Sequence, residues 1–366
     1  MTRYRLGLAA STAFVFLSPA FAMAAAPDVV VSIKPIHSLV ASIMKGVGEP
    51  SLIVEGAASP HTYTLKPSNA QALENADVVF WVGPGLEAFL DKPLEALPKK
   101  AKVVELDDAP GLTKLPFREG GAFEAHDHGE HEEHAEGEHA HEHEDHAKAD
   151  AAEAGHDHAH EEGHDHASEE AGHSHEAHEH EEAGHDHGDH DHEHGSFDMH
   201  LWLDPTNAKA MAAEITRSLA EVDPANKTAY ETNLSAVNAQ IDALDAEIAA
   251  QLKPVLEKPF IVFHDAYQYF EKRYGVRVAG SVTVSPETMP GAERLSDIHA
   301  KIEELGAACV FAEPQFEPKL IGVVTEGTEA KSGVLDPEGG ALDAGPDLYG
   351  QLMRNLATSM STCLSQ

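Results

Sequence analysis

The chain has 366 residues, and its 63 acidic side chains against 25 basic ones give it a formal net charge of −38 at pH 7. So acidic a protein repels phosphate backbones, and the composition therefore excludes nucleic acid as a partner. Of the 27 histidines, 22 lie between His126 and His194, together with 24 of the net negative charges.

Residues 1–26 have the pattern of a secretory signal peptide that is removed from the mature protein. Arg3 and Arg5 supply the positive start, the apolar run extends over residues 6–17, and small residues around Ala22 offer a cleavage site. No second apolar stretch is long enough to cross a bilayer, which argues against a membrane anchor. We therefore expect an exported, soluble protein.

Without the signal and the His-rich part, roughly 270 residues remain, which is enough for two α/β lobes. Short apolar runs alternate with amphipathic segments, as is typical of βαβ units over a parallel sheet. We expect strands at Val29–Ile33, Leu52–Val54, Val78–Val82, Lys102–Val104, Phe260–Phe263, Val276–Val282 and Cys309–Ala312. We expect helices near Pro35–Lys45, from Pro67, from Pro205, at Ala292–Leu305 and at Leu348–Ser361.

The segment from His126 to His194, called here the His-rich segment, contains almost nothing besides alanine that could enter a core. Such a composition cannot offset the entropy of ordering, so we predict a disordered loop from about 120 to 196. Repeated Gly-His-Asp-His units pair the imidazoles, as weak and interchangeable zinc sites require. The weak sites are predicted at His126, His128, His156, His158, His164, His166, His185, His187, His192 and His194. The alternative is a plain acidic spacer, which has no need of histidine at one position in three.

The strongest helix signal begins at Asp223-Pro224, a capping residue followed by proline at the first helical position, and ends before Pro254. Its apolar positions recur at spacings of three and four: Tyr230, Leu234, Val237, Ile241, Leu244, Ile248 and Leu252. We interpret it as a stiff linker at 223–253 between an N-terminal lobe at 27–222 and a C-terminal lobe at 254–366.

Three histidines outside the His-rich segment are candidate metal ligands. His61 follows the second expected strand, His200 precedes a helix that Asp204 caps, and His264 follows a strand of the second half. Ligands of open α/β sheets bind at the carboxyl ends of the strands, where these loops lie. Three neutral imidazoles suit Zn²⁺, whereas Mn²⁺ favours harder oxygen ligands.

The fourth ligand position is open between Asp336 and water. Glu313 ends an expected strand at the same edge, where it either orients a ligand or starts a helix before Pro314. We interpret His37 and His299 as surface residues of amphipathic helices. Trp81 and Trp202 are interpreted as core residues.

Cys309 and Cys363 are the only cysteines of the chain. Two separated thiols in an exported protein favour a disulfide over a metal site, and the alternative is a pair of buried free thiols.

Five motifs resemble those of the periplasmic zinc-binding proteins of ABC importers, the ZnuA-like members of the metal-binding cluster of substrate-binding proteins. The motifs are Ser-Pro-His-Thr-Tyr-Thr-Leu-Lys-Pro-Ser, Asp-Val-Val-Phe-Trp-Val-Gly-Pro-Gly-Leu-Glu, His-Leu-Trp-Leu-Asp-Pro, Val-Phe-His-Asp-Ala-Tyr and Phe-Ala-Glu-Pro-Gln-Phe. The resemblance covers nearly all the mature chain and implies two pseudo-symmetric lobes joined by one long helix. It also implies His61, His200 and His264 as zinc ligands.

The sequence departs from the family at one position. Some members carry a glutamate directly before the first ligand, where this chain has Pro60. Manganese-binding relatives use a carboxylate in place of His264, and the aspartate of their site corresponds to Asp336.

The leading hypothesis is a monomeric periplasmic carrier that captures Zn²⁺ and delivers it to an inner-membrane ABC permease with a cytoplasmic ATPase. A periplasmic zinc buffer or chaperone without a permease is the second hypothesis. A zinc hydrolase is the third, because three histidines and a water also form a catalytic site. The chain has neither a His-Glu-x-x-His motif nor a nucleophile elbow, so we do not expect an enzyme.

Overall fold

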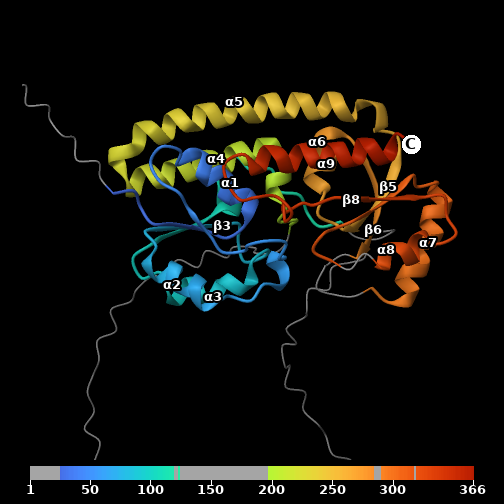
Figure 1. Cartoon of the computed structure of the whole chain (residues 1–366), viewed down its shortest axis with the longest axis horizontal. Helices are drawn as coiled ribbons and strands as arrows, with labels where there is room; N and C mark the ends of the chain where they lie inside the picture. Colours follow the sequence, from blue (N-terminus) through green and yellow to red (C-terminus); the bar gives the residue numbers. More distant parts are fainter. Residues whose placement is uncertain (1–24, 119–122, 124–196, 284–289, 317–318) are drawn as a thin grey trace, which may run out of the picture. The chain divides into compact units, whose positions relative to one another are not determined.

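Figure 1 shows a computed structural model of the chain, and the structure describes residues 25–118, 123, 197–283, 290–316 and 319–366. The expected signal peptide, apart from its last two residues, and the expected zinc sites of the His-rich segment lie outside the described residues. Within the described part, no helix has the length and apolar character that a membrane crossing requires.

The first half of the chain forms a four-stranded parallel sheet in the order β2-β1-β3-β4. Its strands are β1 (Val29–Val31), β2 (Ser51–Leu52), β3 (Val78–Trp81) and β4 (Lys102–Glu105). The helices between them are α1 (Lys34–Ile43), α2 (Pro67–Asn75) and α3 (Asp91–Ala96). Every residue of β1 and β3 is buried, as expected of valine-rich parallel strands that helices cover on both faces.

The second half repeats this plan with the order β6-β5-β7-β8. Its strands are β5 (Pro259–His264), β6 (Arg277–Thr283), β7 (Cys309–Ala312) and β8 (Lys331–Val334). Its helices are α6 (Gln268–Tyr274), α7 (Ala292–Leu305), α8 (Lys319–Thr325) and α9 (Leu348–Leu364). The two sheets thus have the same strand order, which confirms the expected α/β architecture of two similar halves.

Several short 3-10 turns shape the loops. They are Pro60–Thr62, Ala88–Leu90, Leu106–Asp108, Leu201–Leu203, Pro224–Asn226 and Lys253–Val255. Two of them flank the long helix α5 (Lys227–Leu252), so helical structure continues on either side of it.

Helix α5 runs alongside α4 (Pro205–Val222) and α9 (Figure 1). Six of its seven expected apolar positions are buried, and Leu234 is partly buried. One detail of the expected start of this helix is wrong, namely the capping role of Asp223. The Asp223 carboxylate caps no backbone amide but accepts hydrogen bonds of 2.7 Å from the Tyr230 hydroxyl and the Asn226 side chain. The α-helix therefore begins after a 3-10 turn.

The interpretation of His37 as a surface residue is wrong. Its side chain lies in α1, which packs against α4, α5 and α9 as well as against its own sheet, so the residue is only 7% exposed. Its Nε2 atom lies 3.0 Å from the carbonyl oxygen of Pro50. The error has a tertiary cause, because helices pack against α1 on the side away from its sheet and so bury a polar position that the sequence pattern assigns to the surface.

The disulfide between Cys309 and Cys363 is present, as predicted. It joins the first residue of β7 to α9, which extends to Leu364 and is therefore longer than expected. Trp81 and Trp202 are both buried in the core, as expected. The division of the chain at 27–222, 223–253 and 254–366 stays a prediction.

Candidate metal centre

Three histidines come from three different local structures. His61 lies in the 3-10 turn after β2, where its backbone amide donates to the Ser59 hydroxyl. His200 immediately precedes the 3-10 turn Leu201–Leu203 that leads into α4. His264 is the last residue of β5, so the strand reaches one residue further than expected and includes the candidate ligand.

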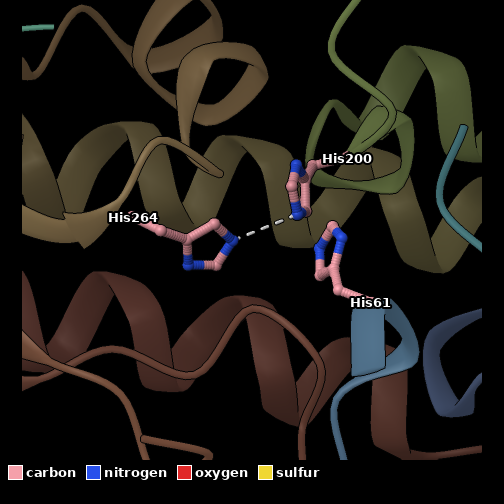
Figure 2. A group of neighbouring side chains, drawn as sticks. All are labelled: His61, His200 and His264. Atoms are coloured by element: carbon pink, nitrogen blue, oxygen red, sulfur yellow. Dashed lines mark hydrogen bonds between the residues drawn. The ribbon is translucent and has the colours of Figure 1, made fainter. Parts of the chain in front are cut away.

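The three imidazoles converge although their residues are far apart in the sequence (Figure 2). One nitrogen from each ring lies within 4.8 Å of the other two. The ring centroids are 5.2 Å apart for His200 and His264, 5.6 Å for His61 and His200, and 5.9 Å for His61 and His264. His200 and His264 are buried, and His61 is partly buried.

Two buried carboxylates hold the outer nitrogens of these rings. Asp198 Oδ1 lies 2.7 Å from His200 Nδ1 and also accepts the His200 backbone amide at 3.0 Å. Glu313 Oε1 lies 2.8 Å from His264 Nδ1 and also accepts the Tyr267 hydroxyl at 3.2 Å. A carboxylate accepts only, so it selects the tautomer that carries its proton on Nδ1. Both Nε2 atoms are then left with bare lone pairs.

These two Nε2 atoms face each other at 3.3 Å, the contact drawn dashed in Figure 2. In neutral rings with the tautomers that Asp198 and Glu313 select, neither Nε2 atom carries a hydrogen, so the two atoms repel unless a cation lies between them. That cation is either a shared proton, which makes the contact a hydrogen bond, or a metal ion. Two nitrogens about 2.0–2.1 Å from one zinc ion at the tetrahedral angle lie about 3.3–3.4 Å apart. The observed separation therefore equals one edge of a zinc coordination tetrahedron.

The electrostatics of the three rings differ. Burial lowers the pKa of His61 well below its usual value, and the charges that His200 and His264 can carry lower it further. Burial also opposes protonation of His264, but the charge and hydrogen bond of Glu313, together with the charges of Asp265 and Asp198, raise the pKa of that ring. Of these two rings, His61 is therefore the weaker competitor for protons, and His264 is the ring at which protons would compete more strongly with a metal ion.

Asp336, the candidate fourth ligand, is engaged in its own loop. Its Oδ1 accepts from Gln315 Nε2 at 2.8 Å and from the amide of Glu338 at 3.3 Å, and its Oδ2 accepts from the amide of Ala341 at 3.3 Å. Among the described residues, the group that could hold one ion around these rings consists of the three histidines. The other expected surface histidine, His299, lies on α7 with its Nε2 atom 2.9 Å from the carbonyl of Glu326.

Asp198 was missed by the sequence reasoning. The signal was its place two residues before His200, since side chains two apart in an extended segment point to the same side. Glu313, in contrast, lies where the sequence suggested that a ligand-orienting carboxylate could be, directly after β7.

Two similar parallel sheets joined by a long helix, with imidazoles from both halves meeting at one point, define the class of two-lobed metal-binding proteins. The chain belongs to the family described as zinc-uptake complex component A, periplasmic, which matches residues 29–363. This confirms the resemblance seen in the five motifs.

Known proteins of similar sequence and fold agree with this family. The high-affinity zinc uptake system protein ZnuA of Brucella suis biovar 1 is 57% identical over 338 residues, which is 92% of each chain. A crystal structure of ZnuA matches with a TM-score of 0.65 at 24% identity, over 93% of this chain and 99% of that one. The periplasmic zinc-binding protein TroA of Treponema pallidum matches with a TM-score of 0.67 at 18% identity, over 93% and 100%. The two structural matches show the fold alone.

Proposed function

We propose that this component of a zinc-uptake system binds one Zn²⁺ tightly at His61, His200 and His264 and delivers it to an inner-membrane ABC permease with a cytoplasmic ATPase. The observation that carries the proposal is the 3.3 Å separation of the Nε2 atoms of His200 and His264. The Nδ1 atoms of the same rings contact Asp198 and Glu313, which orients both Nε2 atoms toward one point.

The donor set favours zinc as the cargo. Three neutral imidazoles suit Zn²⁺, whereas a manganese site would call for more oxygen ligands. The carboxylates behind His200 and His264 increase the basicity of the rings and fix their orientation. The printed name of the Brucella relative, a high-affinity zinc uptake protein, agrees with this choice.

Water is the proposed fourth ligand. Both oxygens of Asp336 already accept hydrogen bonds within the loop from Asp336 to Ala341, and the group of potential ligand atoms within 4.8 Å of one another contains the three histidines without Asp336. An open coordination position suits an ion that has to leave again. A hydrolase would use the same water as a nucleophile, and zinc-dependent cleavage of a model ester by the loaded protein would favour that alternative.

The remaining parts of the proposal concern the cell. The N-terminal signal is proposed to be cleaved on export, and the mature chain to act as a monomer in the periplasm. The His-rich segment is proposed to hold further zinc ions weakly.

A competition titration with a chromophoric zinc chelator tests the tight site. Wild type, His61→Ala, His200→Ala, His264→Ala and the control His299→Ala would be compared, since His299 is a histidine of α7 outside the site. Each site variant should weaken zinc binding by at least about tenfold, because one of three protein ligands is lost, and the control should bind like wild type. Wild-type affinity in all three site variants would refute the ligand assignment.

Zinc-limited growth of cells that lack their own zinc-binding component separates a carrier from a buffer. A carrier restores growth only when the permease is present, and its His200→Ala variant does not restore it. A buffer would act equally well without the permease, and that result would refute delivery.

A further inference from the structure

Residues that lie before and after the His-rich segment in the sequence meet close to His200. Pro116 and Phe197 form an antiparallel β-bridge, and the amide of Asp198 donates to the carbonyl of Leu115 at 2.9 Å. We call the residues 115–118 and 197–198 the stem. The stem ends at Asp198, whose carboxylate contacts the ring of His200.

The stem belongs to the first half of the chain, but helix α6 of the second half holds it. The Tyr269 hydroxyl donates to the carbonyl of Asp198 at 2.6 Å and accepts the amide of Leu115 at 3.1 Å. Gln268 Nε2 donates to the carbonyl of Pro116 at 3.3 Å. Tyr269 thus joins both strands of the stem to the half of the chain that carries His264.

Arg118 joins the stem to Asp265, the residue directly after His264. Its Nε atom donates to Asp265 Oδ2 at 3.0 Å and its Nη2 atom to Asp265 Oδ1, so the guanidinium grips the carboxylate with two prongs. A third contact joins Nη1 to Glu271 of α6. Asp265 is the residue directly after His264, and its side chain is only 3% exposed.

This forked ion pair is rigid, and its aspartate side is buried, so losing Arg118 leaves the Asp265 carboxylate without its charge partner. The ring of Phe123 lies against the Arg118 guanidinium, whose carbon is 4.0 Å from the ring centre, and further shields it from water. Arg118 therefore fixes Asp265, which directly follows His264. Leu115 and Tyr269 bind the backbone of Asp198, which contacts the His200 ring.

We infer that Arg118, gripping Asp265 and Glu271, is a positioning residue that sets the spacing of His200 and His264 across the two halves and thereby the zinc affinity. This inference rests on the proposed function. Arg118 touches no metal, so its effect passes entirely through the geometry of the ligands. Small errors in that geometry are costly, since residues behind the ligands typically change metal affinity by about 10–100-fold.

The test compares Arg118→Gln with Arg273→Gln in the full chain. Arg273 is a matched control, because it also forms a two-pronged ion pair with one aspartate, Asp245, but on the exposed side of α6. Zinc affinity is measured by chelator competition, and the Co²⁺-loaded proteins are compared by visible absorption. Thermal unfolding of the metal-free proteins reports stability separately.

Arg118→Gln should weaken zinc binding about tenfold or more and alter the Co²⁺ spectrum, whereas Arg273→Gln should change neither. Arg118→Lys keeps the charge but loses the fork, so its affinity should fall in between, and it replaces the glutamine variant should that one not fold. Asp265→Asn should weaken binding too, and the loss in the double variant with Arg118→Gln should be smaller than the sum of the single losses, because the two variants share the Arg118–Asp265 contact.

Unchanged affinity and an unchanged Co²⁺ spectrum in Arg118→Gln would overturn the inference, as would an equal loss in Arg273→Gln. Fully additive effects of Arg118→Gln and Asp265→Asn would overturn it as well. These results are distinct from failure of the proposed function, which would show in wild type and in the histidine variants.

Discussion

Lys34 Nζ lies 2.8 Å from the carbonyl oxygen of Gly340, although the two residues come from opposite halves of the chain. The same ammonium group donates to the carbonyls of Gly339 and Leu342, and Lys34 as a whole is only 7% exposed. One buried cation thus ties the start of α1 to the loop that follows Asp336.

Lys34→Met should destabilise the protein, because the carbonyls of Gly340 and Leu342 lose the ammonium donor, whereas the carbonyl of Gly339 still accepts the amide of Leu342. The expected loss is about 2–4 kcal/mol of unfolding free energy, with each unsatisfied buried group costing about 1–3 kcal/mol. Urea denaturation measures it, and Lys272→Met, an exposed change on α6, serves as the control. A Lys34→Met variant as stable as the control would show that the three contacts contribute nothing.

Glu313→Gln should change how zinc binding depends on pH. In the metal-free protein burial opposes the charge on His264, but Glu313 raises the pKa of this ring above its ordinary value of 6.5. Protons therefore compete with zinc from above pH 6.5 downward, and wild-type affinity falls as the pH drops through that range. Without the carboxylate, burial dominates and the fall should begin at lower pH, while affinity at pH 8 is weaker because the ring is less basic.

Chelator competition between about pH 5.5 and 8.5 and the NMR titration of the His264 ring measure this, with Glu303→Gln on α7 as the control. The same pair contributes to stability with a defined sign. A raised folded-state pKa stabilises the metal-free fold below the unfolded value of 6.5, and this stabilisation disappears as the pH rises through the pKa of His264. If zinc affinity and the stability of the metal-free protein depended on pH in Glu313→Gln as they do in wild type, both expectations would be wrong.

Deletion of residues 126–194 should leave one tight zinc and remove the weaker ones. His61, His200, His264 and the stem all lie outside the deleted range, so the tetrahedral edge is preserved. Calorimetry measures the number of ions bound and their affinities. Loss of the tight ion in the deleted protein would contradict the division into one tight site and many weak ones.

A downward pH titration of the zinc-loaded full chain should release the ions in two stages. Exposed histidines follow the reference pKa near 6.5, so the weak ions should leave between roughly pH 7 and 5.5. The tight ion should leave last, because several protons have to displace it from a preformed site. Simultaneous release of all ions would refute this order.

Removing the disulfide should reduce stability without affecting zinc. Cys309 and Cys363 close a loop with a sequence separation of 54, for which the chain-entropy model gives about 4 kcal/mol. Cys309 begins β7, whereas Glu313 follows the opposite end of that strand, so the metal centre is not directly altered. The Cys309→Ala/Cys363→Ala variant should melt earlier yet bind zinc like wild type at 25 °C, and dithiothreitol should not lower its melting temperature further.

Local chemistry in the sequence was enough for the main elements and for the choice of three candidate ligands. Valine-rich runs indicated most of the strands, the Asp204-Pro205 pair indicated the start of α4, and the apolar spacing indicated α5. Each of these sequence signals depends on residues that are close together in the chain. Short elements such as α6 and β8 were missed. Helix α6 has 7 residues and strand β8 has 4, so neither is long enough to show a clear periodicity in the sequence. Tertiary packing stabilises such short elements.

Only the tertiary structure decided which residues meet across the two halves. The burial of His37, the Lys34 contacts and the Arg118 grip on Asp265 all join positions distant in the chain. A sequence contains the residue types for such contacts but not their pairing, because pairing depends on how the folded halves bring the chain together. The three histidines could be chosen by their chemistry, whereas the 3.3 Å between His200 and His264 follows from packing alone.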